Sequence, residues 1–196
     1  YWYSTNSFSE TMNYIVTGLF CSGKSTFLRI AQKYNFKVLK SDDLVSSYYN
    51  DTNIINALKD KFKITNIKDN LKIVIKDLFL KSEENKEIIE NIIHPYVHSK
   101  INEELHSNDN LMVEVPAIIK NKELINNNKS IYIESTNINR LKYYKTKEIN
   151  DTYFYERINE YQKHYSSIKS CCDIIINNDN SIEDFHKFFD EEVVKS

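Results

Sequence analysis

The sequence predicts an α/β fold in three layers, in which a five-stranded parallel sheet is covered by helices on both faces. Two observations predict this class. Short apolar runs of β-type alternate with segments of helical periodicity along the 196 residues. The chain's only two glycines, Gly18 and Gly23, lie in one stretch directly after the first of these runs. Ligands bind at the carboxyl ends of the strands in such sheets, and Gly18 falls at such an end.

The predicted strands are residues 13–17, 36–39, 111–115, 131–133 and 173–176. After the first strand, residues 24–34 place their apolar side chains at helical spacing, which predicts a helix. Asp42 and Pro116 follow the second and third strands. Because the carboxyl ends of parallel strands share one edge of the sheet, we expect Asp42 and Pro116 to lie near the glycine-containing stretch.

The stretch Gly18-Leu19-Phe20-Cys21-Ser22-Gly23-Lys24-Ser25 matches the phosphate-binding loop pattern G-x-x-x-x-G-K-[ST]. Glycine adopts positive φ and lets backbone N–H groups approach an anion without an intervening Cβ. The helix that follows would turn the orphan N–H groups of its first turn toward the phosphates. Lys24 would reach the β- and γ-phosphates, and the Ser25 hydroxyl would bind Mg²⁺. The alternative, a solvated turn before an ordinary helix, is disfavoured by the strand and helix predicted on either side.

The chain divides into a core and one insertion. Residues 12–50 and 109–196 form the predicted phosphate-binding core. Residues 51–108 contain no predicted strand and follow two helical faces, so we expect a helical insertion that faces the loop. Pro95 lies within the second helical segment and is expected to kink or divide it near His94.

Composition limits the classes of partner. The net charge of −2 gives no global attraction to nucleic acid or to an anionic membrane, so phosphate binding must be local. The three cysteines have no framework spacing, which favours reduced thiols and a cytoplasmic setting. No apolar run approaches the length of a membrane span. Residues 1–11 precede Met12, where the core pattern begins, and are expected to form an extension outside the fold.

Three carboxylates lie near the predicted phosphate site. Asp42 and Asp43 follow the second strand, where a carboxylate can accept the proton of an attacking hydroxyl or hold Mg²⁺ through water. The alternative role is the N-cap of a helix that starts near Leu44; we expect Asp42 in the site and Asp43 at the helix start. Glu114, in the third strand, approaches Mg²⁺, faces outward or pairs with a lysine, since side chains alternate along a strand.

Arginine is scarce in this chain, which draws attention to the arginines in its C-terminal half. Arg140, after the fourth strand, and Arg157 are candidates to clamp ATP phosphates from a mobile lid over residues 140–160 or so. His94 is a candidate donor to a phosphate or a ribose. A lone histidine on an apolar helix serves as readily as a structural hydrogen-bonding group, so both roles stay open.

A series of motifs runs along nearly all of the chain after Met12. They are Thr17-Gly18 through Ser22-Gly23-Lys24-Ser25-Thr26, Val38-Leu39 through Asp42, Ile92-Ile93-His94-Pro95, Val113 through Pro116, Arg140-Leu141, Gln162 and Asp173-Ile174-Ile175-Ile176-Asn177-Asn178. In these motifs the chain resembles the dephospho-coenzyme A kinase family, a group of small P-loop kinases related to the nucleoside monophosphate kinases. The His-Pro step on a long helix and the final acidic, apolar and double-asparagine stretch are the most particular to that family.

The resemblance implies transfer of the γ-phosphoryl group of ATP to the ribose 3′-hydroxyl of dephospho-coenzyme A, giving coenzyme A and ADP in the last step of coenzyme A biosynthesis. It implies Asp42 as the general base, with Lys24 and Arg140 as further catalytic residues. The residues implied for ATP binding are Gly18, Cys21, Ser22, Gly23, Lys24, Ser25, Thr26, Arg140 and Arg157.

The resemblance also implies the acceptor side and the cofactors. The insertion would be the acceptor-binding lobe, with Asp42, Lys72, His94 and Pro116 as substrate contacts. Mg²⁺ would bind Ser25, with Asp42 or Glu114 held to it through water. ATP and dephospho-coenzyme A are the expected partners, with no nucleic acid and no membrane, and the chain is expected to be a monomer or a weak homo-oligomer.

Several positions depart from the family pattern. Lys40 replaces the first acid of an Asp-x-Asp step, Ser46 replaces a basic residue, Lys72 stands for an arginine, and Lys120 replaces an acid. Two alternatives therefore stay open: another small-molecule P-loop kinase, of the nucleoside monophosphate type, and a non-catalytic module that binds nucleotide or coenzyme A. A GTPase is disfavoured, because the nearest guanine-reading string, residues 121–124, lacks the required aspartate.

Overall fold

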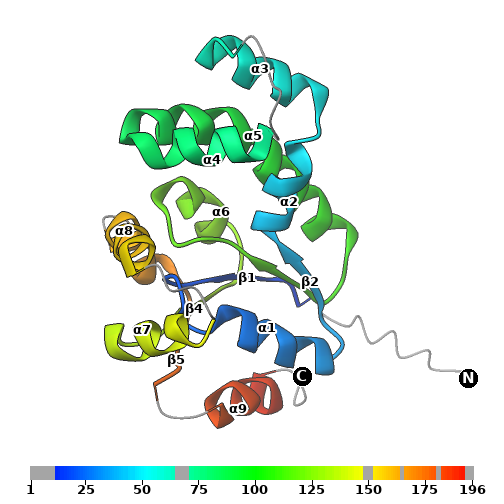
Figure 1. The fold of residues 1–196 in the computed structure, drawn as a ribbon. Coiled ribbons are helices and arrows are strands. Elements are labelled where there is room, and N and C mark those ends of the chain that lie inside the picture. Colours follow the sequence, from blue (N-terminus) through cyan, green and yellow to red (C-terminus); the bar gives the residue numbers. More distant parts are fainter. Residues whose placement is uncertain (1–11, 65–70, 148–151, 164–165, 180–181, 193–196) are drawn as a thin grey trace, which may run out of the picture.

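The computed structural model describes residues 12–64, 71–147, 152–163, 166–179 and 182–192 (Figure 1). The predicted extension at residues 1–11 lies outside these described residues. Five parallel strands form one sheet in the order β2-β3-β1-β4-β5, which confirms the predicted fold class. The strands are β1 (Tyr14–Thr17), β2 (Lys37–Lys40), β3 (Leu111–Glu114), β4 (Ser130–Glu134) and β5 (Ile174–Asn177).

The central strand, β1, positions the site. It pairs with β3 on one side, where Ile15 faces Val113, and with β4 on the other, where Ile15 faces Ser130. The chain fills the β2–β3 side of the sheet first and the β4–β5 side afterwards. The strand order therefore reverses beside β1, and a crevice at such a reversal is the usual ligand site of an open parallel sheet.

Side chains of the strands alternate between two buried clusters, so the sheet is covered on both faces. Tyr14 and Val16 of β1 pack with α1 (Lys24–Lys33) and α9 (Glu183–Glu192), whereas Ile15 packs with the opposite cluster. Figure 1 shows α1 and α9 on one side of the sheet and the helices between β2 and β4 on the other. The short helices on this second side include η1 (Ile119–Asn121) and α6 (Lys122–Asn126).

The described part of the insertion is helical. It consists of α3 (Thr52–Phe62), α4 (Leu71–Lys81) and the long α5 (Glu83–Ser107). The Asp51 side chain caps α3, and the Ser82 hydroxyl caps α5 by accepting the N–H of Asn85 at 3.2 Å. α5 runs through Pro95 as one helix, so the predicted division there is wrong. Ile93 and Val97, on either side of Pro95, are both buried, so both parts of the helix pack against the core.

Three further helices surround the carboxyl ends of the strands. α2 (Ser41–Tyr48) follows β2 directly, α7 (Asn137–Lys145) follows β4, and α8 (Thr152–Lys163) precedes η2 (Ser166–Cys171). Within the described residues, no helix combines the length and the apolar character needed to cross a membrane.

Candidate active site

The glycine-containing loop connects β1 to α1. Gly18 and Gly23 both have positive φ, of 146° and 105°. A Cβ on Gly18 would lie 2.4 Å from the carbonyl oxygen of Ile133, and one on Gly23 would lie 2.1 Å from Nδ2 of Asn178. Both glycines are thus required by close packing as well as by backbone conformation.

The outer side of this loop is held by hydrogen bonds. The Asn178 side chain donates to the carbonyl of Ser22 at 2.9 Å, and the Asn178 N–H donates to Glu134 O at 2.8 Å. The loop leads into α1, whose N-cap, Gly23, provides no side-chain acceptor for the first-turn N–H groups. Those N–H groups, together with the helix dipole, make the start of α1 a site for an anion.

Lys24 lies across the loop in this structure. Its ammonium group donates to Gly18 O at 2.8 Å and to Leu19 O at 3.1 Å, and it lies 4.0 Å from Oε1 of Glu114. Burial lowers the pKa of Lys24, whereas the Glu114 and Asp42 carboxylates oppose that shift. A buried ammonium held only by carbonyls and a distant carboxylate is well suited to bind a phosphate oxygen.

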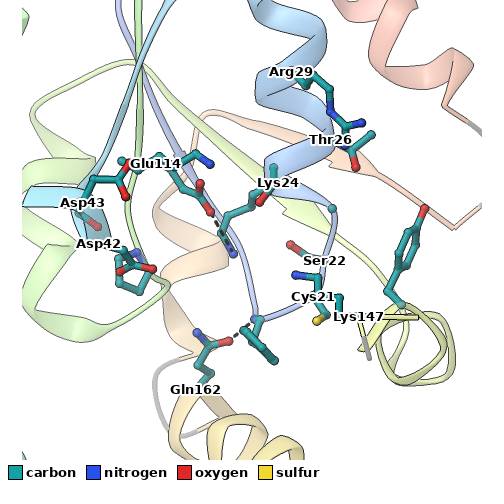
Figure 2. A pocket seen from close by; sticks show the side chains of 17 residues that line it. Cys21, Ser22, Lys24, Thr26, Arg29, Asp42, Asp43, Glu114, Lys147 and Gln162 are labelled. Carbon is teal, nitrogen blue, oxygen red and sulfur yellow. Dashed lines mark hydrogen bonds and ion pairs between the residues drawn. The ribbon is translucent and has the colours of Figure 1, made fainter. Parts of the chain in front are cut away.

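A cavity of about 530 Å³ opens beside the loop (Figure 2). It is lined by the loop, the first turns of α1 and α2, the ends of β2 and β3, and residues of α7 and α8. The sequence-predicted residues that line it are Cys21, Ser22, Gly23, Lys24, Ser25, Thr26, Asp42, Glu114 and Pro116. These residues come from three separate stretches of the chain, and the fold brings them together.

Asp42 lines the cavity and Asp43 lies in the first turn of the helix, as expected, but the start of that helix and its cap differ from the prediction. The helix begins at Ser41 rather than near Leu44, and its N-cap is Lys40, whose side chain makes no capping bond. Asp43 therefore does not cap the helix, and it lines the cavity together with Asp42. The backbone of Lys40 is still extended, and helical conformation begins at the next residue, Ser41. Both carboxylates lie in its first turn, where the helix dipole stabilises negative charge.

Glu114, at the end of β3, faces the cavity, so the outward-facing alternative is wrong, whereas the alternative of a lysine partner is confirmed by the ion pair with Lys24. It lies opposite Lys40 in the register of β2 and β3. Burial raises the pKa of the Glu114 carboxyl, and the cations Lys24 and Lys40 counteract that rise. A carboxylate and two ammonium groups thus share one wall of the cavity.

The two predicted arginine clamps lie elsewhere. Arg140 is only 2% exposed; its Nε donates to Phe20 O at 2.7 Å and its Nη1 to Asn137 Oδ1 at 3.0 Å. Arg157 donates to the carbonyl of Leu80 in α4. Neither arginine is among the cavity-lining residues.

Of the predicted acceptor contacts, Asp42 and Pro116 line the cavity. His94 does not line it; its Nδ1 is buried without a hydrogen-bond partner, and its ring lies 5.5 Å from that of His98. Burial lowers the pKa of His94 to about 4. The backbone of Lys72 belongs to α4, but its side chain lies outside the part of the structure that is described.

Sequence reasoning missed the residues that hold the loop from the α7–α8 side. The Phe20 N–H donates to Oε1 of Gln162, and the Phe20 ring contacts Tyr144 and Phe154. Lys147 lies over the same ring, 5.7 Å from its centroid, and lines the cavity. Gln162 already stood out as one of the motif residues, whereas no pattern in the sequence distinguishes Lys147 from the other lysines.

Solved structures share this architecture. A Thermus thermophilus protein aligns with a TM-score of 0.75 and 16% identity, over 94% of this chain and 97% of that one. A shikimate kinase from Acinetobacter baumannii, in complex with shikimate, aligns with a TM-score of 0.59 and 14% identity, over 96% and 97%. These likenesses concern the fold. Together with the glycine loop, Lys24 and the carboxylates beyond it, the fold defines the P-loop kinase class.

Comparison with known sequences identifies the family within the P-loop kinase class. The family model for dephospho-CoA kinase matches residues 14–184, and the chain belongs to that family. A curated dephospho-CoA kinase of Campylobacter jejuni subsp. jejuni is 27% identical over 129 residues, which cover 61% of this chain and 64% of that relative. A solved Campylobacter jejuni dephospho-CoA kinase aligns with a TM-score of 0.64 and 22% identity, over 93% of this chain and 96% of its own.

Proposed function

We propose that this protein transfers the γ-phosphoryl group of ATP to the ribose 3′-hydroxyl of dephospho-CoA, forming CoA and ADP. The observation that carries the proposal is the cavity, in which the anion-binding start of α1 and Lys24 face the carboxylates of Asp42 and Glu114. Family membership supports dephospho-CoA as the acceptor. The ATP phosphates would lie among the backbone N–H groups of residues 18–26.

Lys24 has the central role on the ATP side. Its ammonium would exchange the carbonyls of Gly18 and Leu19 for oxygens of the β- and γ-phosphates. Gly18 and Gly23 shape the loop, and Cys21, Ser22, Ser25 and Thr26 line the phosphate site. Positive charge and fixed N–H groups would then stabilise the charge on the transferring group, which is the main service of such a site.

The residues present fit Mg²⁺ held jointly with phosphates. The described residues contain no cluster of three or more His, Cys, Asp or Glu side chains that could hold a metal by themselves. Mg²⁺ instead favours one or two protein oxygens, several waters and substrate phosphates. The Ser25 hydroxyl, with Asp42 or Glu114 through water, supplies such oxygens. Bound there, Mg²⁺ would neutralise charge on the phosphates.

Asp42 is the proposed general base. Its carboxylate would accept the proton of the 3′-hydroxyl as that oxygen bonds to the γ-phosphorus and the bond to the β–γ bridging oxygen breaks. The position at the first turn of α2 suits this role, because it projects from a rigid element on the cavity wall. Asp43 lines the same wall and is the natural comparison residue.

The insertion is the proposed acceptor lobe. Its long helix α5 packs against α2, the helix that carries Asp42. Pro116 lines the cavity on this side, and we retain Lys72 and His94 as proposed acceptor contacts from the family pattern. Arg157 bonds to α4 within the insertion, which ties the proposed lid to the acceptor lobe. We place the reaction in the cytoplasm, with a monomer or a weak homo-oligomer as the working unit.

The proposal is tested by measuring ADP release and CoA formation with dephospho-CoA, and with a panel of nucleoside monophosphates, in the presence of Mg²⁺. We expect dephospho-CoA to be the preferred acceptor. In the Asp42→Asn variant we expect kcat to fall by about 10² or more, the usual effect of losing a catalytic base, while ADP binding is retained.

The Asp43→Asn variant is the matched control, because it removes the neighbouring charge from the same helix turn. Preference for a nucleoside monophosphate would reject the proposed acceptor. An Asp42→Asn variant with unchanged turnover would reject the proposed base.

A further inference from the structure

We propose that Lys147, just after α7, binds the β-phosphate of the nucleotide. It would be the cation by which the end of α7 contacts ATP. The proposal rests on the proposed function, since it assigns a contact within the same site. In this proposal Lys147 takes the phosphate-binding role that the sequence suggested for Arg140 and Arg157.

Both arginines already donate hydrogen bonds to other parts of the protein, and neither lines the cavity. Arg140 is buried, and two of its nitrogens donate to Phe20 O and to Asn137. The third nitrogen, Nη2, is buried without a hydrogen-bond partner among the described residues, and Arg140 does not line the cavity, so its guanidinium holds the loop from behind. Arg157 donates to the Leu80 carbonyl and lies over the ring of Tyr153, with 5.1 Å between the guanidinium carbon and the ring centroid.

Lys147, which follows α7, does line the cavity. Its backbone N–H donates to Tyr144 O at 3.1 Å, which fixes the residue directly after the last turn of α7. Its ammonium lies over the Phe20 ring, at the tip of the loop, and the side chain lines the cavity. A lysine whose ammonium group lies over an aromatic ring of the loop, and whose side chain lines the cavity, is placed to bind an anion there.

The side of the loop on which Lys147 lies indicates which part of the nucleotide it contacts. Figure 2 shows Lys147 beside Cys21, on the side of the loop away from Asp42 and Asp43. Burial raises the pKa of the Cys21 thiol. The positive charge of Lys147 opposes this rise more strongly than that of Lys24 does. The acceptor hydroxyl belongs on the side of Asp42. Lys147 therefore faces the leaving group, whose charge grows as the bond to the γ-phosphorus breaks.

The test compares nucleotides with and without a β-phosphate. We would measure dissociation constants for ADP and AMP by calorimetry in wild-type protein and in the Lys147→Gln, Lys147→Arg and Lys145→Gln variants. Lys145 is the exposed last residue of α7, two positions before Lys147, and does not line the cavity, so it controls for the change in net charge. In Lys147→Gln we expect ADP affinity to fall about tenfold, as for loss of one charged hydrogen bond, with AMP affinity unchanged.

The Lys147→Arg variant should keep ADP affinity close to that of the wild type, because arginine retains the charge. Equal losses for ADP and AMP would overturn the proposal in favour of a packing role on Phe20. Unchanged ADP affinity, or the same loss in Lys145→Gln, would also overturn it.

A separate assay of CoA formation by the wild-type protein tests the proposed function. If that assay fails while Lys147→Gln selectively weakens ADP binding, the acceptor assignment is wrong and the contact of Lys147 stands.

Discussion

The hydrogen bond between Gln162 and Phe20 predicts a measurable link between α8 and nucleotide affinity. Gln162 is 7% exposed, and its Oε1 accepts the N–H of Phe20 within the phosphate loop. The change Gln162→Met keeps an unbranched side chain of similar length and removes the acceptor. On the other side of the same residue, Arg140 continues to hold the Phe20 carbonyl.

The expected size of the effect follows from that geometry. A buried N–H that loses its acceptor costs about 1 to 3 kcal/mol. The Phe20–Gln162 bond is only partly buried, so water can replace part of it, and we expect a cost near the lower end of that range. Because the loop conformation held by this bond is the one that binds phosphate, the loss should raise the ADP dissociation constant about tenfold, at about 1.4 kcal/mol per tenfold.

Calorimetric titration with ADP measures this change, and a thermal unfolding scan measures Tm. The chain has one other glutamine, Gln32, which is exposed on α1, so Gln32→Met is the matched control and should leave ADP affinity unchanged. A Gln162→Met protein with a lower Tm and normal ADP affinity would show that Gln162 serves packing alone. That result would refute the reasoning that α8 sets the loop conformation.

Two further predictions concern the loop and the insertion. Gly23→Ala should abolish ADP binding in calorimetry and lower Tm, because φ is 105° and the added Cβ would lie 2.1 Å from Asn178 Nδ2; normal ADP binding would show that the loop tolerates a side chain there. Burial lowers the pKa of His94 to about 4 from 6.5, with Glu90 opposing this shift and His98 and Lys120 adding to it. As the pH falls from about 6.5 to about 4, the unfolded chain binds a proton that the folded protein does not, so stability should fall. His94→Gln should flatten this decline in denaturant unfolding across that pH range, whereas His106→Gln, on the exposed side of α5, should leave it in place.

Local signals explain why the sheet and the phosphate loop could be predicted from the sequence. The three central strands are short, mostly apolar and buried on both faces, so runs such as residues 13–17 and 131–133 reveal them directly, whereas the edge strands β2 and β5 are only partly buried. The loop is a contiguous motif whose glycines are required by local backbone conformation. Asp42 and Pro116 could be placed near it because the carboxyl ends of parallel strands meet at one edge.

Tertiary packing explains what the sequence did not reveal. Arg140 is a strong candidate for a phosphate contact by residue type, yet the packing of α7 against the loop buries it behind Phe20. Lys147 resembles any surface lysine until the fold brings the end of α7 to the cavity. The continuity of α5 through Pro95 likewise depends on buried neighbours that belong to other elements.

The lysines at two of the positions that depart from the family pattern have acidic partners in the structure. Lys40 lies opposite Glu114 in the sheet register and counteracts the rise in the Glu114 pKa that burial causes. Lys120 lies 3.1 Å from Oε2 of Glu90, a carboxylate that is otherwise buried. An unpaired buried charge is strongly destabilising, so the ion pair with Glu90 makes Lys120 compatible with its surroundings. The positive charge of Lys40 favours the ionised form of Glu114, which is the form that the proposed Mg²⁺-bound water would need as an acceptor. A change of sign at position 40 is therefore compatible with a working phosphoryl-transfer site.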